Sequence, residues 1–319
     1  APSLTLAASS TANSGMLQAG DTLSLDASSA IVNRTSGGVL TNGEADKNVS
    51  IAAASLTNAG QIQSTRAIYA AISGVTANSG TLLTLDAASG GAARDLTWGT
   101  QSLSNSGNIL SSGVAKISVA SNFDNHSSGV IAANQSLTLG SGRAINAGTV
   151  QSGTAYELAA TSVENSGSML SGAVMSIESA STLVNTGRIQ ADGALTITTP
   201  ESLTNSTNAN ILGGASVTLV SGASGWSLAN SGRIQSSDAL VIGASSSRVD
   251  LVNATTGTVY SGDTLDVNAS AIDNRNLLRG TAATTFSVTD NFKNSGVVAT
   301  AGMAGATLSI EAAELNNKS

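Results

Sequence analysis

The sequence predicts an all-β fold, a parallel β-helix (solenoid) of about 14–15 coils with a period near 20 residues. Three observations predict it. An asparagine returns at intervals of 19 to 27 residues, short segments alternate apolar and polar side chains, and charged and aromatic residues are scarce. A fixed period with occasional lengthening is typical of a solenoid, because insertions fall in its loops.

The recurring asparagine marks one turn in every repeat. Fifteen positions can be assigned, and nine begin an Asn-x-Gly phrase in which x is Ser, Ala or Thr. These nine are Asn13, Asn58, Asn78, Asn105, Asn146, Asn165, Asn185, Asn230 and Asn294. The other six are Asn33, Asn125, Asn205, Asn253, Asn274 and Asn316. Because Asn tolerates the left-handed backbone region and Gly enters it freely, the phrase predicts a turn.

Stacking of successive repeats predicts a structural role for these asparagines. Each side chain lies above the previous one, so the amides can hydrogen-bond along the axis as a ladder. Such pairing satisfies polar groups at a partly buried corner, where each unpaired group would cost about 1–3 kcal/mol. We therefore interpret the asparagines as scaffold.

Apolar residues follow the turns at a fixed distance. Two residues past twelve turn glycines lies the series Leu17, Val39, Ile62, Leu82, Ile109, Ile131, Val150, Met169, Ile189, Ile234, Val259 and Val298. Triplets such as Leu195-Thr196-Ile197 have the period-two alternation of a strand with one inward face. With a third short apolar segment, each repeat predicts three strands and a triangular section. Asn205 and Asn274 lack the glycine, so wider or irregular coils are expected there.

Composition supports a solenoid and excludes several functions. Charged residues are 10% of the 319 residues, whereas a globular domain carries about a quarter. The 13 Lys and Arg are scattered and the net charge is −7, which argues against a nucleic-acid partner. No apolar run is long enough for a membrane span, and no signal peptide opens the chain. Zero cysteines exclude disulfides and thiolate chemistry and suit export in an unfolded state.

Residues 1–319 are expected to form one solenoid domain, an internal fragment of a much longer chain, because the repeat pattern reaches both ends. The one histidine, His126, lies in a turn with no partner of catalytic type nearby in the sequence, so we interpret it as an exposed turn residue. No catalytic, cofactor or metal residue is predicted. Parity places Trp98 and Trp226 inward and makes Tyr69 and Tyr260 candidates for exposed contacts.

The phrase apolar-x-Asn-x-Gly-x-apolar, as in Leu56-Thr57-Asn58-Ala59-Gly60, resembles the filamentous haemagglutinin repeats of two-partner-secretion exoproteins. That family includes large adhesins and the CdiA-family effectors of contact-dependent growth inhibition. The resemblance extends from about Asn13 to Asn316. It implies a right-handed parallel β-helix, an outer-membrane secretion partner, and secretion to the outer surface of a Gram-negative bacterium. The family's secretion domain and toxin domain are not recognisable here.

These observations together predict a shaft segment that projects adhesive or toxin-delivery regions toward target cells. A direct contact between this segment and a receptor or host surface is also compatible with them. A dedicated receptor-binding module and, in another class, a carbohydrate-active β-helix enzyme are the alternatives. Insertions around 41–47 and 88–94 share one phase, so both should leave the same corner. If a partner binds, loops on a rigid scaffold are the expected contacts. The candidate residues are Asn42, Glu44, Asp46, Lys47, Arg94 and Asp95.

Overall fold

The protein is an all-β solenoid whose strands run parallel. The computed structural model describes residues 3–41, 47–85, 94–223, 225–301 and 304–318, and no helix occurs within these ranges. The chain divides into two compact units, Ala1–Leu158 and Ala159–Ser319, and the division falls within β16 (Tyr156–Asn165). Counted over both units, the described residues make about 14 turns with a period of about 21 residues. The predicted fold class is confirmed.

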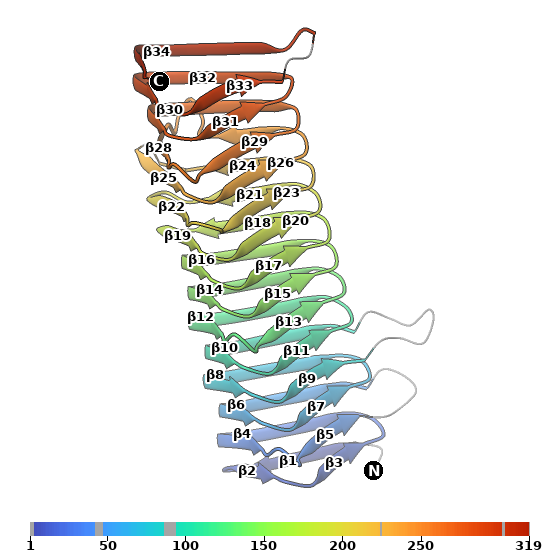
Figure 1. The fold of residues 1–319 in the computed structure, drawn as a ribbon. Helices are drawn as coiled ribbons and strands as arrows, with labels where there is room; N and C mark the ends of the chain where they lie inside the picture. Colours follow the sequence, from blue (N-terminus) through green and yellow to red (C-terminus); the bar gives the residue numbers. More distant parts are fainter. Residues whose placement is uncertain (1–2, 42–46, 86–93, 224, 302–303, 319) are drawn as a thin grey trace. The chain divides into compact units, whose positions relative to one another are not determined.

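The first unit stacks its strands into two sheets (Figure 1). The long-strand sheet contains β1 (Leu4–Ala8), β2 (Thr11–Asn13), β4 (Leu23–Asn33), β6 (Val49–Asn58), β8 (Ile68–Asn78), β10 (Leu96–Asn105), β12 (Ala115–Asn125) and β14 (Leu137–Asn146). The short-strand sheet contains β3 (Met16–Ala19), β5 (Gly38–Thr41), β7 (Gln61–Ser64), β9 (Thr81–Thr84), β11 (Asn108–Ser111), β13 (Val130–Ala133) and β15 (Thr149–Ser152).

The second unit repeats the same two kinds of sheet. Its long-strand sheet contains β18 (Met175–Ser179), β19 (Thr182–Asn185), β21 (Leu195–Thr198), β22 (Ser202–Asn205), β24 (Val217–Val220), β25 (Trp226–Asn230), β27 (Leu240–Ile242), β28 (Val249–Asn253), β30 (Thr264–Asn274), β32 (Ala283–Asn294) and β34 (Thr307–Asn317). Its short strands are β17 (Ser168–Ser171), β20 (Arg188–Ala191), β23 (Asn210–Gly213), β26 (Arg233–Ser236), β29 (Thr258–Ser261), β31 (Leu277–Gly280) and β33 (Val297–Thr300).

The prediction of three separate strands per repeat holds only in part. In β18 and β19, for example, the long segment is split into two strands. In β10 the long segment is one continuous strand. The corner between its two apolar parts is then marked only by a shift in the pairing with β12, between Thr100 and Leu103. A bulge of this kind bends a strand without ending it, so the sequence pattern of two apolar segments is compatible with either form.

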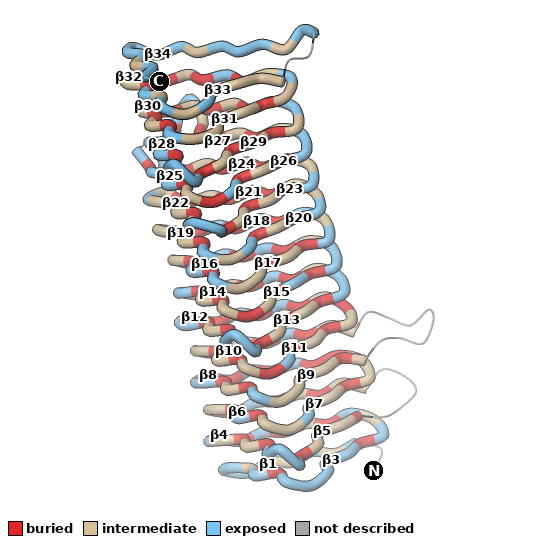
Figure 2. Tube along the Cα trace, viewed as in Figure 1, coloured by how far each residue is buried: buried red, intermediate tan, exposed pale blue. Residues whose placement is uncertain are grey.

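The interior follows the predicted parity (Figure 2). The twelve apolar residues that follow the turn glycines form the predicted inward column. All of them are buried except Leu17 and Val298, which are half-buried. Trp98 and Trp226 are buried as predicted, and Tyr69 is exposed. Tyr260 is half-buried instead, since Arg279 lies over its ring, 5.8 Å from the centroid.

Of the two repeats without a turn glycine, the one at Asn274 has an ordinary turn, contrary to expectation, and the one at Asn205 has a wider turn, as expected. Ile211 and Leu278 take the column position there and are fully buried. The turn after Asn205 is wider, since Asn210 pairs with Arg188 and so lies five residues after its ladder asparagine, whereas Arg188 lies three residues after Asn185. The positive φ of 66° at Asn208 shows that an asparagine supplies the left-handed residue of this turn.

The turn glycines are needed for space, not for a positive φ. Within the described residues, glycine has a positive φ only at Gly225, Gly243 and Gly305, none of which follows a ladder asparagine. A Cβ on Gly60 would instead lie 2.2 Å from the carbonyl oxygen of Gly37 in the preceding turn. Successive turns therefore stack so closely at this corner that a side chain cannot fit, which corrects the prediction based on backbone freedom.

Candidate functional site

The predicted asparagines form a hydrogen-bonded ladder in each unit. In every contact Nδ2 of one asparagine donates to Oδ1 of the asparagine in the next turn. In the first unit the ladder runs Asn13, Asn33, Asn58, Asn78, Asn105, Asn125 and Asn146, with distances of 2.8 to 2.9 Å. In the second it runs Asn165, Asn185, Asn205, Asn230, Asn253, Asn274, Asn294 and Asn317, with distances of 2.7 to 2.9 Å.

Two details of the ladder differ from the prediction. The inner rungs are buried completely instead of partly, as at Asn58 and Asn105. The last rung is Asn317, because Asn316 pairs with Lys293 on the outward side of the strand. The apolar-x-Asn pattern could have identified this rung, because Leu315 is the apolar residue and Asn317 lies two positions after it.

Backbone contacts give the ladder a fixed direction. Nδ2 of Asn33 also donates to the carbonyl oxygen of Gln61 in the next turn, at 3.2 Å. Oδ1 of Asn13 accepts from the backbone N–H of Gly15, at 3.2 Å. A flipped amide would lose both kinds of contact, because only Nδ2 donates and only Oδ1 accepts. The donors therefore all point toward the C-terminal end of each unit.

The residues predicted for a partner contact have separate positions. Asn42, Glu44 and Asp46 lie outside the described residues. Lys47 Nζ lies 3.0 Å from Asp21 Oδ1. Val49 and Leu96 both pair with Ile68, so the described ends of the two insertions leave the same corner, as predicted.

Arg94 and Asp95 support their own backbone surroundings. Asp95 Oδ1 accepts from the backbone N–H of Val114 at 2.9 Å, and the hydroxyls of Thr84 and Ser111 donate to the carbonyl oxygen of Arg94. Both residues are half-buried. These contacts give them a structural role, and whether they also touch a partner stays a prediction.

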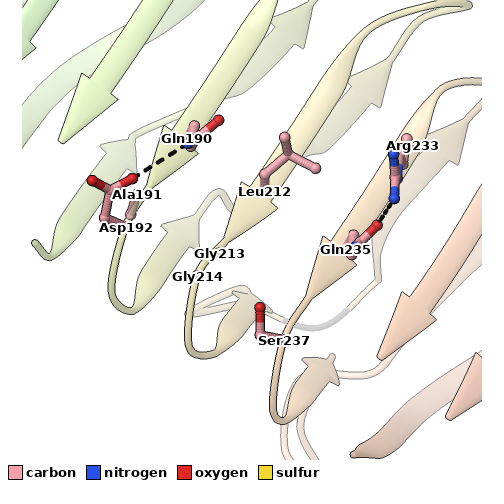
Figure 3. Close-up of a pocket in the computed structure, with 9 residues that line it drawn as sticks. All are labelled: Gln190, Ala191, Asp192, Leu212, Gly213, Gly214, Arg233, Gln235 and Ser237. Atoms are coloured by element: carbon pink, nitrogen blue, oxygen red, sulfur yellow. Dashed lines mark hydrogen bonds between the residues drawn. The ribbon is translucent and has the colours of Figure 1, made fainter. Parts of the chain in front are cut away.

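A shallow groove crosses the outer face of the short-strand sheet in the second unit (Figure 3). Its volume is about 370 Å³, and its lining comes from β20, β23 and β26 and the turns that follow them. Leu212, Gly213 and Gly214 line the middle of the groove. The groove was not predicted from the sequence. The only feature of the sequence that marks it is the Gly213-Gly214 pair, which lies between two strands that begin with Arg-x-Gln.

The polar side chains of the groove hydrogen-bond along their own strands. Gln190 accepts from Arg188 and donates to Asp192 Oδ1, the latter at 3.3 Å. Arg233 donates to Gln235 in the same way (Figure 3). The groove thus offers one guanidinium, two side-chain amides, one carboxylate, one hydroxyl and one leucine. This set can hold a polar ligand by hydrogen bonds, but a single carboxylate does not supply an acid and a base for hydrolysis.

His126 has partners that the sequence argument overlooked. It is exposed, as predicted, but Ser104 Oγ lies 2.9 Å from Nε2 and Asp124 Oδ1 lies 3.6 Å from Nδ1. The register pairs Ser104 with Asp124 on adjacent strands. The order Ser–His–Asp is that of a catalytic triad, yet 3.6 Å is too long for a hydrogen bond.

Acyl transfer would also need donors for an oxyanion. The nearby backbone N–H groups of Ser106 and His126 already donate to the carbonyl oxygens of Asn78 and Asn105. The cluster therefore lacks two of the parts that acyl transfer requires, and we interpret it as surface hydrogen bonding.

The shifted pKa values of the Asp273–Arg275 pair and of Tyr156 have structural causes. The hydrogen bonds from Arg275, at 2.6 Å for the shortest, lower the pKa of Asp273. Burial raises the pKa of Tyr156, whose hydroxyl has no hydrogen-bond partner among the residues that the structure describes. Neither group lies in the groove or beside His126. Perturbed pKa values alone therefore do not indicate a reactive centre here.

Searches beyond these clusters add no assignment. Across the part of the chain that the structure describes, no group of three or more His, Cys, Asp or Glu side chains could hold a metal ion. The same residues contain no helix long and apolar enough to cross a membrane. Comparison with family models, with curated proteins and with solved structures found no match.

Proposed function

We propose that this chain is a shaft segment of an exported bacterial exoprotein, a scaffold that holds adhesive or toxin-delivery regions away from the producing cell. The observation that carries the proposal is the in-register stack of repeats with a buried asparagine ladder in each unit. Every turn repeats the same contacts with its neighbours, and such a solenoid can be lengthened by adding turns.

Export and surface display form the finer part of the proposal. The absence of cysteine is compatible with passage through a pore in an unfolded state. The Asn-x-Gly repeat resembles that of two-partner-secretion exoproteins, whose export uses an outer-membrane partner. We accordingly propose an outer-membrane secretion partner, a location on the outer surface of a Gram-negative bacterium, and a receptor or host surface as the distant target.

An in-phase deletion tests the shaft. Leu183 and Asn185 pair with Leu203 and Asn205, so removal of residues 185–204 joins two equivalent positions and keeps every side chain in phase. A shaft shortened by one turn should still fold, reach the surface of intact cells and support attachment to target cells at the parental level. Circular dichroism, surface protease accessibility and attachment assays measure the three properties.

The matched control is deletion of residues 185–194, which joins Val184 to Leu195 and breaks the phase. It should fail to fold, because it removes the ladder rung Asn185 and the whole of β20, which interrupts both the asparagine ladder and the short-strand sheet. If the in-phase variant folds and is displayed but no longer attaches, the shaft interpretation is wrong. If the parental protein never becomes accessible on intact cells, the export proposal is wrong.

A receptor-binding module is the second candidate, and the groove over β20, β23 and β26 favours it. Arg233→Ala together with Gln235→Ala would remove two polar side chains from the lining of the groove and leave the buried apolar side chains unchanged. Loss of attachment in this variant, with an unchanged fold, would favour a binding module over a plain shaft. Retained attachment would leave the groove without a role in adhesion.

A further inference from the structure

The outer face of the long-strand sheet in the first unit has a shallow hollow beside Tyr69. The hollow has a volume of about 400 Å³ and lies over β4, β6, β8 and β10. Tyr69 is the second residue of β8, and its side chain is 46% exposed. Pockets that hold small ligands have volumes of about 300–1,000 Å³. The hollow is therefore large enough for a small ligand.

The register of the strands places hydroxyl groups on both sides of Tyr69. Ser50 in β6 and Thr97 in β10 both pair with Tyr69 in the parallel sheet. Thr97 is exposed and Ser50 is half-buried. Serine and threonine hydroxyls donate and accept hydrogen bonds, so this row can bind groups of either kind.

The next outward row supplies a flat floor and a carboxylate. Ala52 and Ala71 pair with each other in adjacent strands and are both exposed. Asp26 continues this row in β4 and is exposed too. Asp26 lies two strands from Tyr69 and two residues further along, so their Cα atoms are about 12 Å apart. That separation leaves room for a small ring between the two side chains.

The hollow lies where the repeats of the first unit are longest. The strands on either side of β8 are β6 and β10, and they follow the insertions around 41–47 and 88–94. The described ends of these insertions are held to the scaffold. Lys47 Nζ lies 3.0 Å from Asp21 Oδ1, and Asp95 Oδ1 accepts from the backbone N–H of Val114. Binding residues tend to cluster where loops join a rigid scaffold.

The chemistry of the lining limits the ligand. Among the described residues, the lining contains one carboxylate, that of Asp26, and no Lys, Arg or His. Phosphate and acidic sugars are bound through cationic side chains, so the hollow does not suit them. An ammonium group is typically held by several aromatic rings, whereas Tyr69 is the one aromatic residue in the described lining. These limits favour a neutral ligand with hydroxyl groups.

A neutral sugar ring matches this lining, because it has an apolar face of C–H groups and an edge of hydroxyls. We propose that the hollow binds a hexose unit of a neutral glycan. The ring of Tyr69 packs against the C–H face, and the carboxylate of Asp26 accepts hydrogen bonds from the hydroxyls. The site lies in a different unit from the groove over β20, β23 and β26, and the proposal does not depend on export or on a role as a shaft.

An array of neutral and acidic oligosaccharides, probed with the purified chain, tests the proposal. Binding should appear on glycans that end in a neutral hexose. An excess of the matching methyl hexoside should compete with it, because the hollow takes a single ring. Tyr69→Ala should weaken binding about tenfold, whereas Tyr69→Phe keeps the ring and should stay within about threefold of the parental protein. Asp26→Ala should also weaken binding about tenfold.

The matched control is Thr138→Ala, at the equivalent exposed position two strands beyond Thr97, which should bind like the parental protein. All these side chains point outward, so circular dichroism should show an unchanged fold. Absence of binding to every neutral glycan, or binding only to acidic ones, would overturn the proposal. Full binding by Tyr69→Ala, or loss of binding in the Arg233→Ala, Gln235→Ala variant instead, would place the sugar elsewhere and overturn it as well.

Discussion

A single ladder asparagine satisfies several buried groups at once. Asn105 accepts a hydrogen bond from Asn78, donates to Asn125 at 2.8 Å, and donates to the carbonyl oxygen of Gly107 at 3.1 Å. Its side chain is fully buried. No other residue type has a donor and an acceptor in the same short planar group at this reach, except for a protonated aspartate, and an ionised one would bury a charge.

Asn105→Ala should therefore be strongly destabilising. It removes both contacts along the axis and leaves buried partners unsatisfied, at about 2–4 kcal/mol in the free energy of unfolding. The matched control is Asn317→Ala, the exposed last rung, which should cost under about 0.5 kcal/mol. Chemical denaturation followed by circular dichroism gives both values. Equal losses at the two positions would show that burial of a rung does not increase its contribution to stability.

At the residue scale the sequence predicted which side chains face inward and which asparagines stack. Parity and period were enough for this, because a solenoid repeats one environment in every turn. The sequence missed contacts between turns that depend on three-dimensional reach. Ser104 lies 22 residues before His126, and no pattern within one repeat links them. The error at Asn316 arose at an end, where no later repeat fixes the phase.

At the scale of the turn, the spacing between stacked strands limits what fits. A Cβ on Gly107 would lie 2.1 Å from the carbonyl oxygen of Gly80, a backbone atom that cannot rotate away. A Cβ on Gly15 would meet nothing within 4 Å, because no described turn precedes it. Neither glycine has a positive φ, so the two positions differ in space and not in backbone strain.

Gly107→Ala should lower the free energy of unfolding by at least about 2 kcal/mol, since the backbone of two turns must move apart. Gly15→Ala should change it by less than about 0.5 kcal/mol, or raise it slightly by restricting the unfolded chain. Thermal or chemical unfolding compares the pair. A similar loss at both glycines would mean that backbone freedom, and not the spacing of turns, is why glycine occurs here.

The sequence predicted the elements better than their ends. It identified a turn, a following strand and a later apolar triplet in each repeat, because these depend on local alternation. It did not show whether the long segment forms one strand, as in β10, or two strands, as in β18 and β19. That difference depends on whether the hydrogen bonds between the backbones of neighbouring strands continue through the corner. The alternation of side chains is the same in both cases, so it cannot distinguish them.

At the scale of the whole molecule, stability is a sum of contacts between neighbouring turns. An inner turn such as the one containing β30 has a neighbour on each side, whereas β34 has one. The burial pattern records this, since Phe286 in β32 is buried while Leu308 and Leu315 in β34 are about half exposed. In such arrays the terminal repeats open most easily.

Hydrogen exchange should show this gradient within each unit. In the second unit, backbone amides of β34 should exchange at least about 100-fold faster than those of β30, because opening the end turn breaks one interface and opening an inner turn breaks two. In the first unit, β3 should likewise exchange faster than β9. Exchange followed by mass spectrometry at low protein concentration measures both pairs. Protection that is uniform from β30 to β34 would contradict the neighbour model.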